Sequence, residues 1–546
     1  MMDLKNEFSL PTFEWLTKDA ETKEYSAKYP NYYDELCTKY RDWLMNKYSA
    51  SNANDLDSKL KSAWVNAYGL TVDDETESAS TKIYIFRSLI YNSNRINDEE
   101  LFIKSIMDNY LTSMYTYLKN DVGVKCAVTG NTIFGDAQPQ IAHPNASKTD
   151  FADTHIYWGH PSGNLKTDGT DLAPFNRTGP YTKAGNISML DADILKNGDS
   201  DYVGNLGFIG WLASSRISGK PFVVSEWLEC AGTLTHGEGP VMMSAFASMH
   251  KWNPLSFAWN SSTNYHANLE DGYTSNLDSP FSFTEDPVQR SMFPAASIMF
   301  NRGDVQEAQN GYYESYDSDS EIYIGLGKDK YGESVWSGMH YFPNLSRQAL
   351  IGKTGIKFYN VTSSATSDSS INDTAKANTT KELNGEAVTY TSSTGELITD
   401  LGQSIFKVNT LKSQAVTGYI GGKTVETDNL KLNVTNDFAA VMLTSLNDNS
   451  IATSNRVLLS LVGNSRNHGQ VLSEDGRYIK IGGDNTILTE QIVGTVTLKG
   501  VSGNYKVYSL NSDGSRKAEI AVTNNGNTIS FTLTRDTKAM NFEIVK

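Results

Sequence analysis

The sequence has few basic side chains for its length. Its 47 Lys and Arg residues are outnumbered by 63 Asp and Glu residues, and the formal net charge is −16 at pH 7. A protein that binds nucleic acid needs a basic patch to meet the phosphate backbone, and none is visible. We therefore expect no nucleic-acid partner. The charge suits a neutral or weakly charged substrate, without identifying it.

Cysteines and long apolar runs are also scarce. The three cysteines, Cys37, Cys126 and Cys230, show no C-x-x-C spacing. They read as small core residues and not as a disulfide framework or a metal site. No run of about 18 or more apolar residues occurs, so no membrane span is expected. The first residues show no signal-peptide pattern.

The composition is that of an ordinary globular chain, with 39% hydrophobic and 20% charged residues. A length of 546 residues exceeds what one core usually supports and indicates two or three domains. The 29 Tyr and 9 Trp residues suit stacking on sugar rings, but aromatic side chains also simply fill cores.

Residues 1–305 alternate between strand and helix patterns. Periodicity and helix-end signals, including an apparent capping box that opens at Asn97, predict helices over 33–48, 97–122, 206–216, 239–251 and 286–301. Short apolar runs predict strands over 2–6, 124–129, 151–157, 221–225 and 255–259. Strands separated by helices indicate a parallel sheet. An open doubly wound sheet would also fit, but it would want a glycine-rich phosphate loop, and none follows a strand.

The pattern changes after residue 305. Helical periods vanish, and residues 361–400 form a polar, loop-rich stretch. Short apolar runs over 403–422 and 437–463, and alternating apolar residues over 493–546 with turns at 512–514 and 524–526, indicate an all-β region. We therefore predict two domains: an α/β domain over 1–305 and an all-β region of one or two β-sandwiches over 306–546.

Two carboxylates are placed where chemistry is expected. Glu226 follows the apolar run 221–225, and Glu7 follows Asn6 at the end of the first predicted strand. A carboxylate at the carboxyl end of a barrel strand lies at the mouth, where barrel enzymes carry out catalysis. Cleavage of a glycosidic bond needs one carboxylate to attack or activate water and one to protonate the leaving oxygen. Taken singly, a Glu after a strand is more often a solvated loop residue.

Three neighbours strengthen the interpretation of Glu226. Tyr157 can donate its hydroxyl to that carboxylate and keep it ionised, and His155 can hydrogen-bond a substrate. Trp259, at the end of the following strand, can form the floor under a sugar ring. Each also has a purely structural interpretation, as a barrel-lining or core side chain.

Other candidates are weaker. Glu229 and Glu238 lie near the expected mouth, and Glu238 is a candidate ligand of a sugar hydroxyl, although a role at a helix start is the simpler interpretation. His160 and His236 lack metal-ligand partners at a suitable spacing, so no metal is expected. No G-x-S-x-G motif surrounds Ser225, which argues against a serine hydrolase.

Together the segments Asn6-Glu7, 221–227, 155–157 and 257–259 resemble clan-A glycoside hydrolases over residues 1–305. The resemblance implies strands four, seven, six and eight of a (β/α)8 TIM barrel, followed by β-sandwich appendages. It implies that Glu7 is the acid/base, Glu226 the nucleophile, Asn6 a contact to the substrate 2-hydroxyl and Tyr157 the partner of the nucleophile. It implies a retaining mechanism, a carbohydrate substrate, no cofactor and an extracellular or periplasmic parent protein.

The sequence departs from the family pattern at its start. Only six residues precede Glu7, where the family has strands one to three with their helices. We expect Met1-Met2 to be an internal start, with a signal peptide lost upstream. The chain would then hold about strands four to eight, be inactive by itself and self-associate through the exposed barrel edge. Two other hypotheses stay open: a carbohydrate-binding or assembly protein with a relic half-barrel, and a fragment without independent function.

Overall fold

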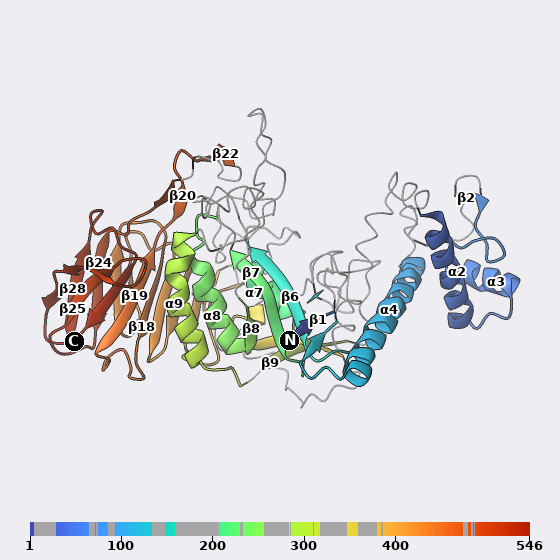
Figure 1. Cartoon of the computed structure of the whole chain (residues 1–546), viewed down its shortest axis with the longest axis horizontal. Coiled ribbons are helices and arrows are strands. Elements are labelled where there is room, and N and C mark those ends of the chain that lie inside the picture. Colours follow the sequence, from blue (N-terminus) through green and yellow to red (C-terminus); the bar gives the residue numbers. More distant parts are fainter. Residues whose placement is uncertain are drawn as a thin grey trace.

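The computed structural model of the chain describes residues 1–4, 29–64, 71–72, 75–85, 93–130, 132–133, 148–158, 207–229, 233–255, 283, 286–309, 311–316, 347–358, 379–383, 386–472, 479–481, 484 and 486–546. They form a helical region (residues 29–122), an α/β region (the parallel strands and helices up to residue 358) and a β region (residues 379–546), shown in Figure 1. Among the described helices, none combines the length and apolar character that crossing a bilayer requires.

The helical region holds α2 (Pro30–Lys47), α3 (Ala53–Ala63) and α4 (Ser93–Thr116), with a small hairpin of β2 (Thr71–Val72) and β3 (Glu75–Thr76). The expected helix at 33–48 is confirmed as α2. Pro30 suits its first turn because the N–H that proline lacks has no helical partner there. The helices share a core of their own, with Tyr40, Leu60 and Trp64 fully buried.

The helix predicted to begin at Asn97 begins four residues earlier, at Ser93. The expected capping box is therefore wrong. Asp98 turns into the core instead, where it accepts hydrogen bonds from Trp64 Nε1 at 2.8 Å and from Tyr48 Oη at 2.7 Å. The helix continues as the π-helix η2 (Tyr117–Val122) and ends at Gly123, whose φ of +78° is the left-handed conformation that glycine adopts freely.

The α/β region is built on parallel strands, as expected. One sheet runs in the order β5 (Thr132–Ile133), β6 (Ala152–Trp158), β7 (Phe222–Glu229) and β8 (Trp252–Pro254), all parallel. Separate parallel pairs join β1 (Met2–Asp3) to β4 (Val128–Thr129) and β9 (Gly311–Tyr316) to β10 (Lys353–Phe358). The helices are α7 (Gly207–Ser215), α8 (Glu238–His250) and α9 (Pro287–Arg302). The described strands form no closed barrel.

One strand boundary differs from expectation. The run predicted to end at 225 extends to Glu229, so Glu226 lies within β7 and not after it. Strand β8 ends at Pro254, and of the strand predicted over 255–259 only Leu255 is among the described residues, so that strand stays a prediction. The helix predicted over 286–301 is confirmed as α9, with Asp286 as its N-cap accepting from the backbone N–H of Val288 at 3.0 Å.

The β region contains one large antiparallel sheet. Its spatial order is β11 (Thr379–Leu383), β12 (Glu386–Thr391), β13 (Leu397–Asp400), β14 (Ile405–Asn409), β15 (Ser413–Gly418), β18 (Ala439–Ser445), β19 (Arg456–Val462), β29 (Asn541–Val545), β25 (Lys506–Leu510) and β26 (Arg516–Ile520). The edge strand β26 is exposed and begins with Arg516-Lys517, charges that disfavour pairing with another chain.

A smaller antiparallel sheet faces the large one. Its order is β16 (Thr424–Glu426), β17 (Leu430–Val434), β24 (Gly494–Lys499), β28 (Thr528–Leu533) and β27 (Thr523–Asn524). Two short pairs complete the region: β20 (Ser465–Asn467) with β23 (Ile487–Thr489), and β21 (Val471–Leu472) with β22 (Ile479–Ile481). Apolar residues of both sheets form one core between them, which is the arrangement of a β-sandwich.

The central strands of the large sheet are buried on both faces. In β18, Ala439, Val441 and Leu443 point into the sandwich core, whereas Ala440 and Met442 belong to a second core shared with helices. Alternation along a strand sends neighbouring side chains to opposite faces. All seven residues of β18 are buried because both faces are covered.

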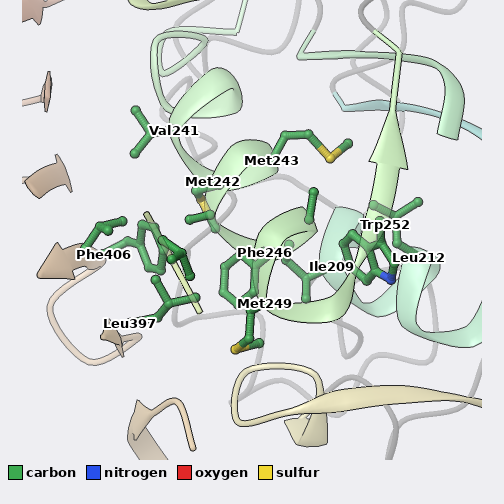
Figure 2. Packing of buried hydrophobic residues seen from close by; sticks show 14 of the residues in the cluster. Ile209, Leu212, Val241, Met242, Met243, Phe246, Met249, Trp252, Leu397 and Phe406 are labelled. Atoms are coloured by element: carbon green, nitrogen blue, oxygen red, sulfur yellow. The ribbon is translucent and has the colours of Figure 1, made fainter. Parts of the chain in front are cut away.

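Helix α8 lies, with α9 beside it, between the parallel sheet and the large antiparallel sheet (Figure 1). Apart from Ser248, all of its residues are buried, as expected for a helix that is apolar on every side. Figure 2 shows Phe246 of α8 beside Phe406 of β14, with ring centroids 5.2 Å apart, while Trp252 packs on the opposite side. The core thus runs across residue 305. The domain boundary predicted there stays a prediction.

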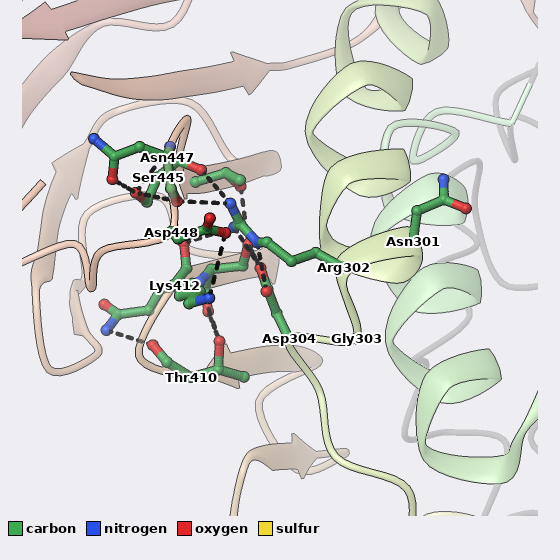
Figure 3. Close-up of polar contacts among 12 residues, drawn as sticks. Asn301, Arg302, Gly303, Asp304, Thr410, Lys412, Ser445, Asn447 and Asp448 are labelled. Carbon is green, nitrogen blue, oxygen red and sulfur yellow. Dashed lines mark hydrogen bonds and ion pairs between the residues drawn. The ribbon is translucent and has the colours of Figure 1, made fainter.

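Arg302, the last residue of α9, ties the α/β region to the β region (Figure 3). Its guanidinium donates to both oxygens of Asp304, at 2.7 and 2.6 Å, and to the carbonyl of Ser445 at 2.7 Å. Asp304 also accepts from Ser413 Oγ at 2.6 Å. A bidentate Arg–carboxylate pair combines strength with fixed geometry. Because Asp304 is almost fully buried, its charge depends on this partner.

We predict that Arg302→Ala lowers the free energy of unfolding by about 3–5 kcal/mol, because it leaves the buried Asp304 carboxylate without its counter-charge. Denaturant unfolding followed by fluorescence measures the change. Lys431→Ala is the control, because it removes the exposed pair with Glu426 and should cost less than about 1 kcal/mol. Equal losses in the two variants would show that the Arg302 contacts are as weak as surface pairs.

Candidate functional site

Strand β6 presents three polar side chains on one face. Ala152 and Ile156 belong to the core that faces the helices. Since side chains alternate along a strand, Asp153, His155 and Tyr157 point to the opposite face of the sheet. The same period of two that defines the strand therefore gathers a carboxyl, an imidazole and a phenol in one column.

Strand β7 meets that column through a β-bulge. Thr154 pairs with Val224 and His155 pairs with Glu226, so Ser225 is an extra residue without a partner position on β6. A bulge of this kind resets the alternation of the strand. Val224, before the bulge, belongs to the helix-facing core. Ser225 and Glu226 contact the polar column, although they are adjacent in sequence.

The five side chains form a connected network. Tyr157 Oη donates to Glu226 Oε2 at 2.8 Å, and His155 Nδ1 lies 3.5 Å from the same oxygen. On the other side of the imidazole, His155 Nε2 lies 2.9 Å from Ser225 Oγ. Ser225 Oγ lies 2.6 Å from Asp153 Oδ2, and the Ser225 backbone N–H donates to Asp153 Oδ1 at 3.0 Å.

The network lies largely out of water. Asp153 and His155 are each 1% exposed, and Glu226 is 9% exposed. Burial raises the pKa of the Asp153 carboxyl from 3.8 to about 6, although the hydrogen bonds from Ser225 and the charge of His155 lower it in part. The charge of Asp3 on β1 acts in the raising direction, which places the end of β1 in the electrostatic neighbourhood of the site.

Past the bulge, β7 ends in a second carboxylate with a different role. Glu229 accepts from the backbone N–H of Gly239 at 2.9 Å and from Thr235 Oγ1 at 3.0 Å, so it serves the first turn of α8. Burial, and then the charge of Glu238, raise the pKa of Glu229 well above its usual range. Glu238 is itself fully buried as the first residue of α8, and its role as a ligand of a sugar hydroxyl stays a prediction.

Three of the predicted site residues, Asn6, Glu7 and Trp259, lie outside the described residues. The approach of Glu7 to Glu226, on which a two-carboxylate mechanism depends, therefore stays a prediction. His155, Tyr157 and Glu226 do come together, and the expected hydrogen bond from Tyr157 to Glu226 is present. The catalytic roles given to these three residues stay predictions as well.

Sequence reasoning missed Asp153 as a member of the site. The period of two over 153, 155 and 157 was sufficient to find it, since it predicts one shared face. Ser225 was considered only as a hydrolase nucleophile. Its contact with His155 depends on the bulge, for which the run 221–225 carries no Gly or Pro signal.

The contact order Ser225, His155, Glu226 matches that of a serine-hydrolase triad. Two features argue against that chemistry. Ser225 Oγ lies within hydrogen-bond distance of the nearly buried Asp153, and the Ser225 backbone N–H is engaged by the same carboxyl. A nucleophilic serine needs its oxygen free to approach a carbonyl and needs free N–H groups near it as an oxyanion hole.

In the part of the chain that the structure describes, no three His, Cys, Asp or Glu side chains are grouped so that they could hold a metal ion. His236 is instead part of a buried contact between regions, with its Nε2 3.1 Å from Ser465 Oγ on β20. The same hydroxyl lies 3.2 Å from Asp286 Oδ1.

No protein-family model matches the chain, and no relative is found among curated proteins. Among solved structures, the catalytic domain of GH30 xylanase C from Talaromyces cellulolyticus is similar at 9% sequence identity and a TM-score of 0.11. That comparison covers 81% of this chain and 92% of the xylanase chain. A likeness of this size establishes no common fold, and the function has to be argued from the residues themselves.

The raised pKa of Asp153 has a consequence for stability. The folded state holds this proton more tightly than the unfolded chain, so the stabilisation is complete below pH 3.8 and is lost as pH rises to about 6. We predict that Asp153→Asn avoids this loss. Between about pH 4 and pH 8, its free energy of unfolding should rise relative to the original chain by about 3 kcal/mol.

Denaturant unfolding at several pH values measures this difference, and its slope with pH matters more than its absolute value. Asp448→Asn is the control, because the Asp448 side chain is almost fully exposed and should show no such slope. A flat difference for Asp153→Asn would mean that Asp153 ionises as easily in the folded chain as in the unfolded one.

Proposed function

We propose that the chain belongs to a retaining glycoside hydrolase, with Glu226 as nucleophile and Glu7 as acid/base. The observation that carries the proposal is the hydrogen bond from Tyr157 to Glu226 at 2.8 Å, in the carboxyl-terminal half of two neighbouring parallel strands. A carboxylate that accepts a hydrogen bond from a phenol while an imidazole nitrogen lies 3.5 Å away is held in one orientation.

The proposed reaction has two steps. In the first, Glu226 attacks the anomeric carbon while Glu7 protonates the leaving oxygen, which gives a glycosyl ester on Glu226. In the second, Glu7 takes a proton from water, the water attacks the same carbon, and Glu226 leaves as a carboxylate. Tyr157 would stabilise the departing carboxylate by the hydrogen bond that it donates.

The wider architecture supports this chemistry in outline. Parallel strands β5 to β8 and the pair β1–β4 are compatible with about strands four to eight of a (β/α)8 barrel, with Glu226 near the carboxyl end where barrel enzymes have their sites. The charge of Asp3 acts on Asp153, which supports a position of β1 beside the site, four residues before Glu7. A neutral polysaccharide or oligosaccharide met outside the cytoplasm is the proposed substrate.

The low exposure of Glu226, 9%, favours a second candidate. A nucleophile has to reach an anomeric carbon, and a largely covered carboxylate suits a site that no longer turns over. In that case the chain is a carbohydrate-binding or assembly protein in which the network is structural. Glycan binding without hydrolysis, unchanged by replacement of Glu226, would support this candidate.

We predict that Glu226→Ala reduces turnover of activated aryl glycosides by orders of magnitude, and that added azide restores part of the rate. In the original chain, 2-deoxy-2-fluoro aryl glycosides should leave a stable sugar adduct on the peptide that contains residues 222–229. Mass spectrometry detects this adduct. Glu426→Ala, an exposed carboxylate of the β region, is the control and should leave the rate unchanged. Full turnover in Glu226→Ala would remove this residue from the mechanism.

We predict that Glu7→Gln slows substrates with poor leaving groups much more than activated aryl glycosides, because only the former need protonation of the leaving oxygen. Steady-state rates on a series of aryl glycosides with graded leaving groups measure the dependence. If all substrates slow by the same factor, Glu7 has no acid role.

A further inference from the structure

We propose that Asp153 and Ser225 are positioning residues that set, through their hydrogen bonds, which nitrogen of His155 carries the proton and therefore whether His155 can donate to Glu226. The proposal deepens the proposed function, because it assigns a regulator to the nucleophile of that reaction. It rests on the arrangement of Asp153, Ser225, His155 and Glu226 in one line across β6 and β7.

Few protons are available to this line of hydrogen bonds. Ser225 has one hydroxyl proton but two partners, Asp153 Oδ2 at 2.6 Å and His155 Nε2 at 2.9 Å. It can donate to one of them only and must accept from the other. The direction in which Ser225 donates is therefore tied to the protonation of both neighbours.

When Asp153 carries a proton, every contact along the line is satisfied. The carboxyl donates to Ser225 Oγ, and Ser225 donates to His155 Nε2. A neutral imidazole that accepts at Nε2 carries its proton on Nδ1, the atom that lies 3.5 Å from Glu226 Oε2. His155 then adds a second donor to the carboxylate that already accepts from Tyr157.

When Asp153 is ionised, the direction reverses. Ser225 donates to the carboxylate, so His155 has to donate from Nε2. A neutral imidazole then turns the lone pair of Nδ1 toward Glu226, and the donor is lost. Adding a second proton to His155 would restore it, but the nearly buried network would then hold three charges instead of two, which is costly.

Charged groups on three strands face the line. Among the described residues these groups are His155 on its own strand, Glu226 on β7 and Asp3 on β1. The charge of His155 lowers the pKa of Asp153, and the charge of Asp3 raises it. Burial is the largest influence and raises the pKa of Asp153 to about 6, within the range that an enzyme commonly meets. The direction of the hydrogen bonds along the line, and with it the tautomer of His155, should therefore change in mildly acidic solution.

The test is the tautomer of His155, measured on the full chain with 15N-labelled histidine by long-range 1H–15N NMR. His155→Gln identifies the signals. We expect proton occupancy mainly on Nδ1 at about pH 5 and mainly on Nε2 at about pH 8, a change of at least about tenfold in the ratio. In Asp153→Asn the amide should donate to Ser225 Oγ permanently, so the Nδ1 tautomer should persist across that range.

Ser225→Ala interrupts the line and Ser225→Thr keeps a hydroxyl, so the first should lose the pH-dependent change and the second should retain it. Circular dichroism establishes that each variant is folded, and Asp153→Asn tests the proposal even if Ser225→Ala does not fold. A wild-type His155 that keeps one tautomer between about pH 5 and pH 8 overturns the proposal. The same follows if Asp153→Asn changes tautomer as the wild type does.

Kinetics provide the second readout. We expect wild-type kcat on activated aryl glycosides to fall at least about tenfold between pH 5 and pH 8 as the donor to Glu226 is lost, and Asp153→Asn to remove most of this fall while KM changes little. Identical pH profiles for the two proteins would overturn the proposal. If no glycoside is hydrolysed but the tautomer changes as expected, the line exists and the proposed function is what fails.

Discussion

The burial of α8 between two sheets is the constraint on which the structure depends. One side of this helix packs against the parallel strands, and the other packs against the large antiparallel sheet, with Phe246 on Phe406. The helix therefore has no side available for water, and neither sheet can shift without opening a core. The strand that leads into α8 is β7, so the strand that carries Glu226 is fixed from behind by the same packing.

A rigid strand matters because the polar network has little tolerance for displacement. Its members lie in a largely dry environment, where a satisfied hydrogen bond is strong and an unsatisfied polar group is costly. Asp153 is engaged through both of its oxygens, and Ser225 links it to His155. These hydrogen bonds orient the neighbours of Glu226. Glu229, at the end of the same strand, instead accepts a hydrogen bond from the first turn of α8.

The residues differ in how far the sequence predicts them. The approach of Tyr157 to Glu226 is predictable in outline, because neighbouring parallel strands present their carboxyl ends together. The face on which Glu226 lies is not, because it depends on the bulge at Ser225. The start of α4 does not follow, since Asn97 and the acidic residues after it look like the start of a helix, whereas Asp98 is held in the core by Trp64 and Tyr48. The apolar run over 221–225 predicts only the first half of β7, because a carboxylate is uncommon inside a buried strand. Tyr157 and His155 on β6 provide the polar contacts that allow Glu226 to lie there.

The two-sided burial of β18 and α8 was only partly predictable for a related reason. An apolar segment shows that it is covered, but not by what. The α/β and all-β halves each have a recognisable pattern, yet the core that joins them consists of residues from both, such as Met242 and Leu397. The shapes of the two surfaces and polar contacts such as those of Arg302 determine how the two halves pack together. Neither produces a periodic pattern in the sequence.

The bulge at Ser225 makes the site depend on the local backbone and not only on residue identity. If β7 ran through Ser225 as a regular strand, every side chain from Glu226 onward would exchange faces: the carboxylate would point into the hydrophobic interior, and Trp227 would occupy its position. Comparisons of this strand with other proteins therefore have to align the bulge first. An alignment that places a gap one position away would match the wrong residue to Glu226, however similar the flanking residues are.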